Sequence, residues 1–188
     1  MKMSMRFFVA AAAIFALAAP LAAAEHVKNG DFENGKTAPW RLDKATPTAS
    51  LAVITDAAPP VGGSGVLGIT VEKGRRIDVC QHVNVGPGKY KFSVYIDTTR
   101  CAPTGVVMVY LGGKAGEKYR SFGSLKTHSN DQNTKKVTVW QKFERIIDIP
   151  ENGKITSINI MLLNIRGTVM LDRISLQDVE ETEKTKVQ

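Results

Sequence analysis

The sequence predicts an all-β fold, a sandwich of two antiparallel sheets, and three observations support this prediction. Apolar and polar residues alternate along many short segments, which is typical of strands with one buried face. Gly, Pro and Asn separate these segments at short intervals, as turns between antiparallel strands require. After the first 24 residues, no segment has the spacing of an amphipathic helix. Strands without helices bury their apolar faces against one another, which favours a sandwich.

The first 24 residues have the composition of a secretory signal peptide rather than of a folded element. Lys2 and Arg6 form a basic start, the apolar run 7–19 follows, and three alanines at 22–24 supply the small residues that a signal peptidase needs. The apolar run is shorter than the ~20 residues of a membrane span. We therefore expect cleavage after Ala24 and a secreted or periplasmic protein.

The mature chain is mildly basic. The formal charge of the 188 residues is +7, and removal of Lys2 and Arg6 lowers it to +5. Both signs are interspersed, which is typical of a solvated surface, although an acidic polysaccharide or an anionic envelope is an alternative partner. No basic stripe is interleaved with aromatic residues, and export also argues against nucleic acid. The length predicts one domain over 25–177, followed by a charged tail over 178–188.

The alternating segments predict eight strands in the mature chain. The stretch Gly112–Lys136 is the longest region without such a pattern, so we expect it to be a long loop, and long loops in such domains are often functional. The predicted strands are Ser50–Thr55, Val66–Val71, Arg76–Val85, Lys89–Asp97, Val106–Leu111, Val137–Ile149, Ile155–Asn164 and Thr168–Leu176.

A hairpin is predicted where Arg76–Val85 is joined to Lys89–Asp97 by a Gly-Pro-Gly turn. Each strand alternates strictly, so one set of side chains is expected in the core and the other on a polar face. Pairing of the two strands would place Asp78 opposite Asp97 and Tyr95 at the centre of one shared polar face.

Two cysteines remain in the mature chain, Cys80 and Cys101. An exported chain meets an oxidising environment, so the pair predicts a disulfide, which would stabilise the fold by ~3 kcal/mol. A metal-binding or catalytic role for the pair is not expected, because its spacing matches no ligand motif.

Four segments resemble carbohydrate-binding modules of families 4, 9, 16 and 22, the galactose-binding-domain-like jelly rolls found beside bacterial cellulases and xylanases. Their order along the chain is also that of these modules. The resemblance implies a jelly roll in which the first and last strands are neighbours, and tryptophans that cover the core at the sandwich edge, here Trp40 and Trp140. The four segments are Val27-Lys28-Asn29-Gly30-Asp31-Phe32-Glu33-Asn34-Gly35 with Pro39-Trp40, Gln81 to Ser93, Trp140-Gln141-Lys142-Phe143 running to Ile149-Pro150, and Val169 to Leu176.

The resemblance further implies a polysaccharide-binding groove on one sheet face. Sugar recognition needs aromatic rings that stack on sugar C–H groups and planar polar groups that bind hydroxyls. A solvated sheet face without a ligand is the alternative. The expected groove residues are Tyr95, Tyr110, Asp97 and Asn159, with Arg76 and Gln81 further out.

The long loop offers a second candidate site, because it combines aromatic and basic residues. These residues would bind a charged glycan, or alternatively hold the loop against the domain. They are Lys118, Tyr119, Arg120 and Phe122.

The resemblance also implies a structural calcium ion that joins the two terminal strands. Glu33 and Asp172 would supply side-chain oxygens, and the backbone around Asn29 and Asp31 would supply carbonyls, a mixture that Ca²⁺ favours. In the alternative, backbone N–H groups and Arg173 satisfy the two carboxylates.

Taken together, these features predict an exported, non-catalytic carbohydrate-binding module that binds a polysaccharide or a cell-envelope glycan, with a partner enzyme as a further expectation. The three histidines lack metal-site spacing, and the chain lacks a nucleophile elbow and a phosphate loop. Paired carboxylates of a glycosidase would need Asp78 and Asp97 to lie together. The alternative is an exported structural or adhesion protein, which predicts an exposed apolar patch or an unpaired edge strand.

Overall fold

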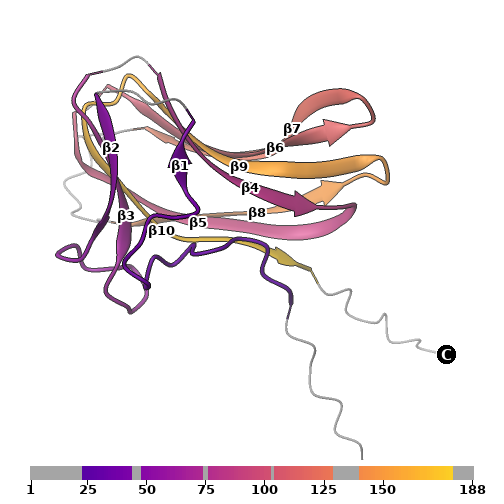
Figure 1. Ribbon diagram of the computed structural model, residues 1–188, viewed down its shortest axis with the longest axis horizontal. Coiled ribbons are helices and arrows are strands. Elements are labelled where there is room, and N and C mark those ends of the chain that lie inside the picture. Colours follow the sequence, from indigo (N-terminus) through magenta and orange to yellow (C-terminus); the bar gives the residue numbers. More distant parts are fainter. Residues whose placement is uncertain (1–22, 44–47, 74–75, 103, 129–139, 180–188) are drawn as a thin grey trace, which may run out of the picture.

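The computed structural model describes residues 23–43, 48–73, 76–102, 104–128 and 140–179. These residues form two five-stranded antiparallel sheets, with no helix among them, which confirms the predicted sandwich (Figure 1). The described residues therefore contain no helix that is long and apolar enough to cross a membrane. Residues 1–22 of the predicted signal peptide and 180–188 of the predicted tail lie outside the described residues.

Each sheet mixes strands from distant parts of the sequence, as a jelly roll requires. The first sheet, here called sheet I, has the order β1–β4–β9–β6–β7, and sheet II has the order β2–β3–β10–β5–β8. In sheet I the strands are β1 (Arg41–Leu42), β4 (Arg76–Val85), β9 (Gly153–Leu163), β6 (Val106–Ala115) and β7 (Lys118–His128). In sheet II they are β2 (Ala49–Ile54), β3 (Val66–Val71), β10 (Gly167–Asp178), β5 (Gly88–Cys101) and β8 (Gln141–Ile149).

The predicted long loop is largely a hairpin. β6 continues to Ala115, a turn at residues 116–117 follows, and β7 pairs back along β6 as far as His128. The prediction failed because β7 (Lys118–His128) is an edge strand with mostly exposed side chains, so its sequence lacks the regular apolar alternation. Residues 129–139, which include the start of one predicted strand, lie outside the described residues.

The predicted pairing of β4 with β5 is wrong. β4 pairs with β1 and β9 in sheet I, whereas β5 pairs with β10 and β8 in sheet II. The turn at 86–87 therefore carries the chain from one sheet to the other. Asp78 and Asp97 consequently lie in opposite sheets, and the carboxylate pair that a glycosidase needs is not formed by them. Alternation specifies which side chains face the core but not which strand lies alongside.

The core lies between the two sheets and follows the predicted alternation. Phe32 and Trp40 add to it from the N-terminal segment, so the expected buried position of Trp40 is confirmed. Among the side chains that meet at its centre are Val107, Val109 and Leu111 of β6, Ile158, Ile160 and Leu162 of β9, and Phe92, Val94 and Ile96 of β5.

The two cysteines lie in different sheets and face different environments. Cys80 follows core residue Val79 on β4 and therefore points away from the core. A register shift between Asp97 and Arg100 of β5 reverses the alternation, so Cys101 packs in the core. Both cysteines are free thiols, and the predicted disulfide is not formed.

The N-terminal segment lies alongside β10, which confirms the expected neighbourhood of the chain ends (Figure 1). His26 N donates to Leu176 O at 2.9 Å, and Ile174 N donates to Gly30 O at 3.0 Å. A Cβ atom at position 30 would overlap Ile174 O, so this close approach requires glycine.

Candidate functional site

The outer face of sheet I carries a tyrosine and an asparagine on adjacent strands. Tyr110 of β6 and Asn159 of β9 are register partners, and both side chains point away from the core. Tyr110 is half-buried, and burial, reinforced by the charge of Asp78, raises the pKa of its hydroxyl. An aromatic ring and a planar amide therefore lie side by side on this face.

Three polar groups converge over Gly112, which lies two residues after Tyr110 on β6. A Cβ atom there would overlap the Tyr119 hydroxyl and would lie 2.9 Å from both Asn159 Nδ2 and Ser157 Oγ. Asn159 Nδ2 donates to Ser157 Oγ at 2.9 Å. We call the Tyr119 hydroxyl, Asn159 and Ser157 the Gly112 cradle, since only the missing side chain of Gly112 leaves room for it.

An arginine–aspartate pair flanks the same face on β4. Arg76 donates from Nε to Asp78 Oδ2 at 2.6 Å and from Nη2 to Asp78 Oδ1 at 3.0 Å. This bidentate contact fixes the planar guanidinium of Arg76. The hydrogen bond to Asp78 and the Asp78 charge raise the pKa of Arg76. Arg76 remains more than half exposed, so its guanidinium can still reach a ligand.

The predicted groove residues are divided between two faces and the interior. Tyr110, Asn159 and Arg76 share the outer face of sheet I, but Tyr95 and Asp97 lie on the outer face of sheet II, because β4 and β5 belong to different sheets. Gln81 lies on the core side of β4 and is 1 % exposed.

The predicted loop residues also separate. Tyr119 is 64 % exposed and reaches the Gly112 cradle. Phe122 packs against the core with the Arg120 guanidinium 5.4 Å from its ring centre, so this pair holds β7 in place. No local sequence pattern pointed to Ser157, which is brought to Gly112 by the pairing of β6 with β9.

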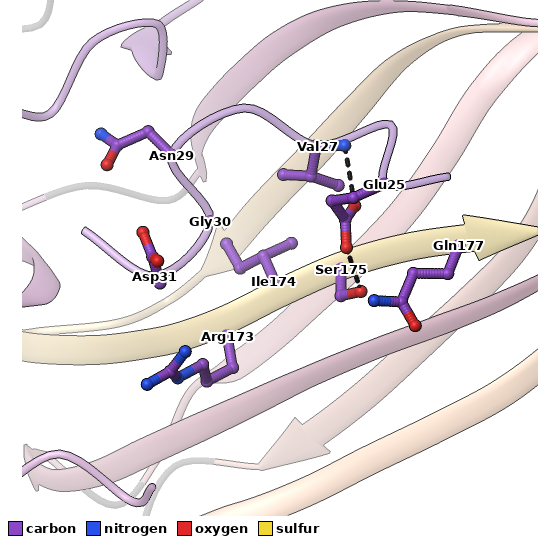
Figure 2. Close-up of a pocket in the computed structure, with 9 residues that line it drawn as sticks. All are labelled: Glu25, Val27, Asn29, Gly30, Asp31, Arg173, Ile174, Ser175 and Gln177. Carbon is purple, nitrogen blue, oxygen red and sulfur yellow. Dashed lines mark hydrogen bonds between the residues drawn. The ribbon is translucent and has the colours of Figure 1, made fainter. Parts of the chain in front are cut away.

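A second pocket, of about 250 Å³, lies where the terminal segments meet (Figure 2). Glu25 closes one side of it, since its carboxylate accepts hydrogen bonds from Val27 N, Leu176 N and Ser175 Oγ. Asn29 and Asp31 line it from the N-terminal segment, and Arg173 lines it from β10. Of the four predicted calcium ligands, Asn29 and Asp31 are the two that line this pocket.

The two expected carboxylate ligands differ in how well they are already satisfied. Glu33 accepts from Ser64 N at 2.9 and 3.0 Å and from Gly65 N at 3.2 Å, and these bonds lower its pKa. Asp172 is fully buried, and this burial raises its pKa to about 6. Its Oδ1 accepts from Arg173 N, but its Oδ2 has no hydrogen-bond partner among the described residues and lies 3.9 Å from Arg173 Nε.

A calcium ion would therefore fit only part of the predicted ligand set. Asp172 Oδ2 and Asn29 Oδ1 are buried oxygens with no hydrogen-bond partner in the part of the chain that the structure describes, and a hard cation binds such oxygens. The described residues contain no cluster of three or more His, Cys, Asp or Glu side chains arranged to hold a metal. The remaining ligands would have to be backbone carbonyls and water.

Known structures share this architecture, although the sequence matches no protein-family profile and no curated protein. A family 61 carbohydrate-binding module in complex with beta-1,4-galactotriose has a TM-score of 0.58 at 17% identity, covering 83% of this chain and 99% of the module. A family 22 xylan-binding domain has the same TM-score at 16% identity, covering 83% and 96%.

A third similar structure is the enzymatically active domain of tailspike protein 4 from bacteriophage CBA120, with a TM-score of 0.61 at 13% identity. The match covers 82% of this chain but only 21% of the tailspike chain. At these identities the likeness establishes the fold. The chain thus has the jelly-roll sandwich fold of carbohydrate-binding modules of the family 16, 22 and 61 kind.

Proposed function

We propose that this chain is an exported, non-catalytic carbohydrate-binding module that binds a polysaccharide on the outer face of sheet I. The observation that carries the proposal is the Gly112 cradle beside the Tyr110 ring. This arrangement combines an aromatic surface with hydroxyl and amide groups, the two elements that a sugar ring requires.

The roles of the individual groups follow from their chemistry. The half-buried Tyr110 ring stacks on the apolar side of a sugar, and a contact of this kind is worth ~0.5–1.5 kcal/mol. Asn159 and the Tyr119 hydroxyl bind sugar hydroxyls, and the exposed edge of Arg76 extends the contact along the glycan. Binding needs no bond cleavage and therefore no tuned acid–base pair.

The proposal is tested by retention of the mature chain, Glu25 to Gln188, on a panel of polysaccharides at low and high salt. Galactan and xylan belong in the panel, because the similar structures above are a complex with beta-1,4-galactotriose and a xylan-binding domain. Retention by a neutral glycan that persists in high salt is expected from stacking and neutral hydrogen bonds, since salt screens only charge interactions.

Variants locate the site. Tyr110→Ala and Asn159→Ala should each weaken retention, whereas Ile146→Ala, at an exposed residue of β8 in sheet II, serves as the control that leaves retention unchanged. Retention that neither sheet I substitution weakens, or no retention by any glycan, would overturn the proposal.

We further propose that calcium binds at the junction of the terminal strands through Asp172, with Asn29 Oδ1 and backbone oxygens near Asp31 as the other protein ligands. The support is the buried, unpartnered Asp172 Oδ2, whose charge the 3.9 Å contact with Arg173 only partly offsets. A bound ion would tie the N-terminal segment to β10 and stiffen the fold without taking part in sugar recognition.

A structural or adhesion protein is the second candidate function. Its support is a pair of edge strands, β7 of sheet I and β8 of sheet II. Each strand carries one large hydrophobic side chain that is more than half exposed, Tyr119 on β7 and Ile146 on β8. The large exposed hydrophobics of the described residues are, however, spread over three elements rather than gathered in one patch. Capture of a protein partner that Ile146→Lys abolishes, together with no glycan retention, would favour this function.

A further inference from the structure

The outer face of sheet II contains a pocket that the proposed sheet I site does not use. Its volume is about 700 Å³, within the range of small-molecule sites. Tyr95, Asp97 and Arg100 line it from β5, Trp140 lines it from the chain just before β8, and the loop 56–60 closes it from the side of β2 and β3.

Asp97, one of the residues that line this pocket, has a buried carboxylate oxygen without a partner among the described residues. Asp97 is fully buried; its Oδ1 accepts from Thr99 N at 2.7 Å, and its Oδ2 has no hydrogen-bond partner in the described part of the chain. Buried carboxylate oxygens are nearly always paired, because an unpaired one loses its hydration without compensation. A ligand hydroxyl that donates to Oδ2 would restore the missing bond.

The walls of the pocket are fixed before any ligand arrives. Trp140 Nε1 donates to Ala58 O at 2.8 Å, which holds the indole against the loop and leaves no unpaired donor on it. Beneath it, Ala57, Val66 and Met170 form a small apolar cluster that anchors the loop to sheet II. Two half-buried aromatic side chains, Trp140 and Tyr95, line the pocket, and the hydrogen bond to Ala58 holds Trp140 in place.

The charges of the pocket define the ligand class. Asp97 contributes a negative charge and Arg100, at the exposed end of β5, a positive one, so a ligand with net charge of either sign meets one repelling group. A neutral polyhydroxyl ring satisfies both, since one hydroxyl donates to the carboxylate and another accepts from the guanidinium. The C–H face of such a ring would lie against Trp140 and Tyr95.

We propose that this pocket is a second carbohydrate site, which takes one neutral sugar ring, such as the end of a glycan. The inference rests on the proposed function only for the ligand class, because the pocket itself is independent of the sheet I face. The two sites lie on opposite outer faces of the sandwich, so one domain would hold two glycan chains at once.

The test is NMR titration of the two tryptophan indole signals with methyl glycosides of glucose, galactose, mannose and xylose, and with glucosamine and glucuronic acid. Trp140 lines the pocket and Trp40 lies in the core, so Trp40 is an internal control in the same spectrum. We expect a saturable shift of the Trp140 signal alone, with a dissociation constant in the millimolar range, as a single ring of few atoms allows.

Asp97→Asn, which keeps the shape but removes the charge, should weaken this binding roughly tenfold or more. Asp148→Asn, the same change at an exposed residue of β8, should leave it unaltered. Arg100 is exposed, so Arg100→Ala should leave the fold intact, and it should also weaken binding. Tyr110→Ala should weaken polysaccharide retention but leave the Trp140 shift intact, which separates failure of this site from failure of the proposed function.

The outcomes decide the inference in either direction. A shift of Trp140 by a neutral glycoside that both Asp97→Asn and Arg100→Ala reduce supports it. No shift with any probe, a shift with glucosamine or glucuronic acid alone, or a shift indifferent to both substitutions overturns it.

Discussion

The side-chain amide of Gln81 pairs with the backbone of Lys28 through two hydrogen bonds. Lys28 N donates to Gln81 Oε1 at 2.9 Å, and Gln81 Nε2 donates to Lys28 O at 2.8 Å. The amide thus makes the two hydrogen bonds that the backbone of a neighbouring strand would make, and it holds the N-terminal segment against β4. Gln81 is a structural element of the fold rather than part of a sugar-binding face.

Replacement of this amide should destabilise the domain. Gln81→Ala removes both part-buried hydrogen bonds to the Lys28 backbone, and we expect a loss of about 1–3 kcal/mol in the free energy of unfolding. Urea denaturation measures it, with Gln141→Ala on the exposed surface of β8 as the control. Equal stability of the two variants would show that the paired amide contributes nothing.

A methyl group at Gly112 should disrupt sugar binding while the fold persists. The Cβ atom of Gly112→Ala overlaps the Tyr119 hydroxyl, the end of an exposed side chain that can move aside, so we expect the cradle to open with little change in melting temperature. Polysaccharide retention should then fall while the melting temperature stays the same.

The control variant must be a glycine whose replacement causes neither a clash nor strain. Gly116→Ala is unsuitable, because its φ of 60° makes a side chain there strained. Gly86→Ala has open space and serves instead. Undiminished retention by Gly112→Ala would argue against the cradle.

Calcium should raise the melting temperature through Asp172. An ion present at a hundred times its dissociation constant stabilises by about 2.7 kcal/mol, and a chelator should remove this effect. Asp172→Asn should abolish the response to calcium, while Asp148→Asn retains it. Without calcium, Asp172→Asn should be at least as stable as the parent chain, because it removes a buried charge whose pKa burial raises to about 6. A melting temperature unchanged by chelator would contradict the calcium proposal and leave Arg173 as the cation that offsets the Asp172 charge.

Both thiols should be present and protected. Cys80 is 5% and Cys101 7% exposed, and burial, with the nearby charge of Asp97, raises the pKa of the Cys101 thiol to about 12. Titration with a thiol reagent should therefore find two cysteines after unfolding without reductant and little reaction in the native protein. If unfolding under these conditions releases no thiol, the cysteines are bonded after all.

The sequence alone determined eight of the ten strands that the structure describes, all but β1 and β7, and the direction in which most of their side chains point. The ranges Val66–Val71 and Arg76–Val85 were predicted to the residue, and Tyr110 and Asn159 were placed on one outer face. These properties follow from period-two alternation and from turn residues, which act over a few neighbouring positions.

Tertiary structure alone decided which strands pair and which chemical groups meet. It separated Tyr95 and Asp97 from Tyr110, kept Cys80 apart from Cys101, and brought Ser157 to the Gly112 cradle. β4 and β5 have the same alternation whether a tight turn pairs them within one sheet or carries the chain across to the other. Their sheet assignment depends on contacts with β9 and β10, strands about 75 residues further along the chain, and no local pattern in either strand encodes that choice.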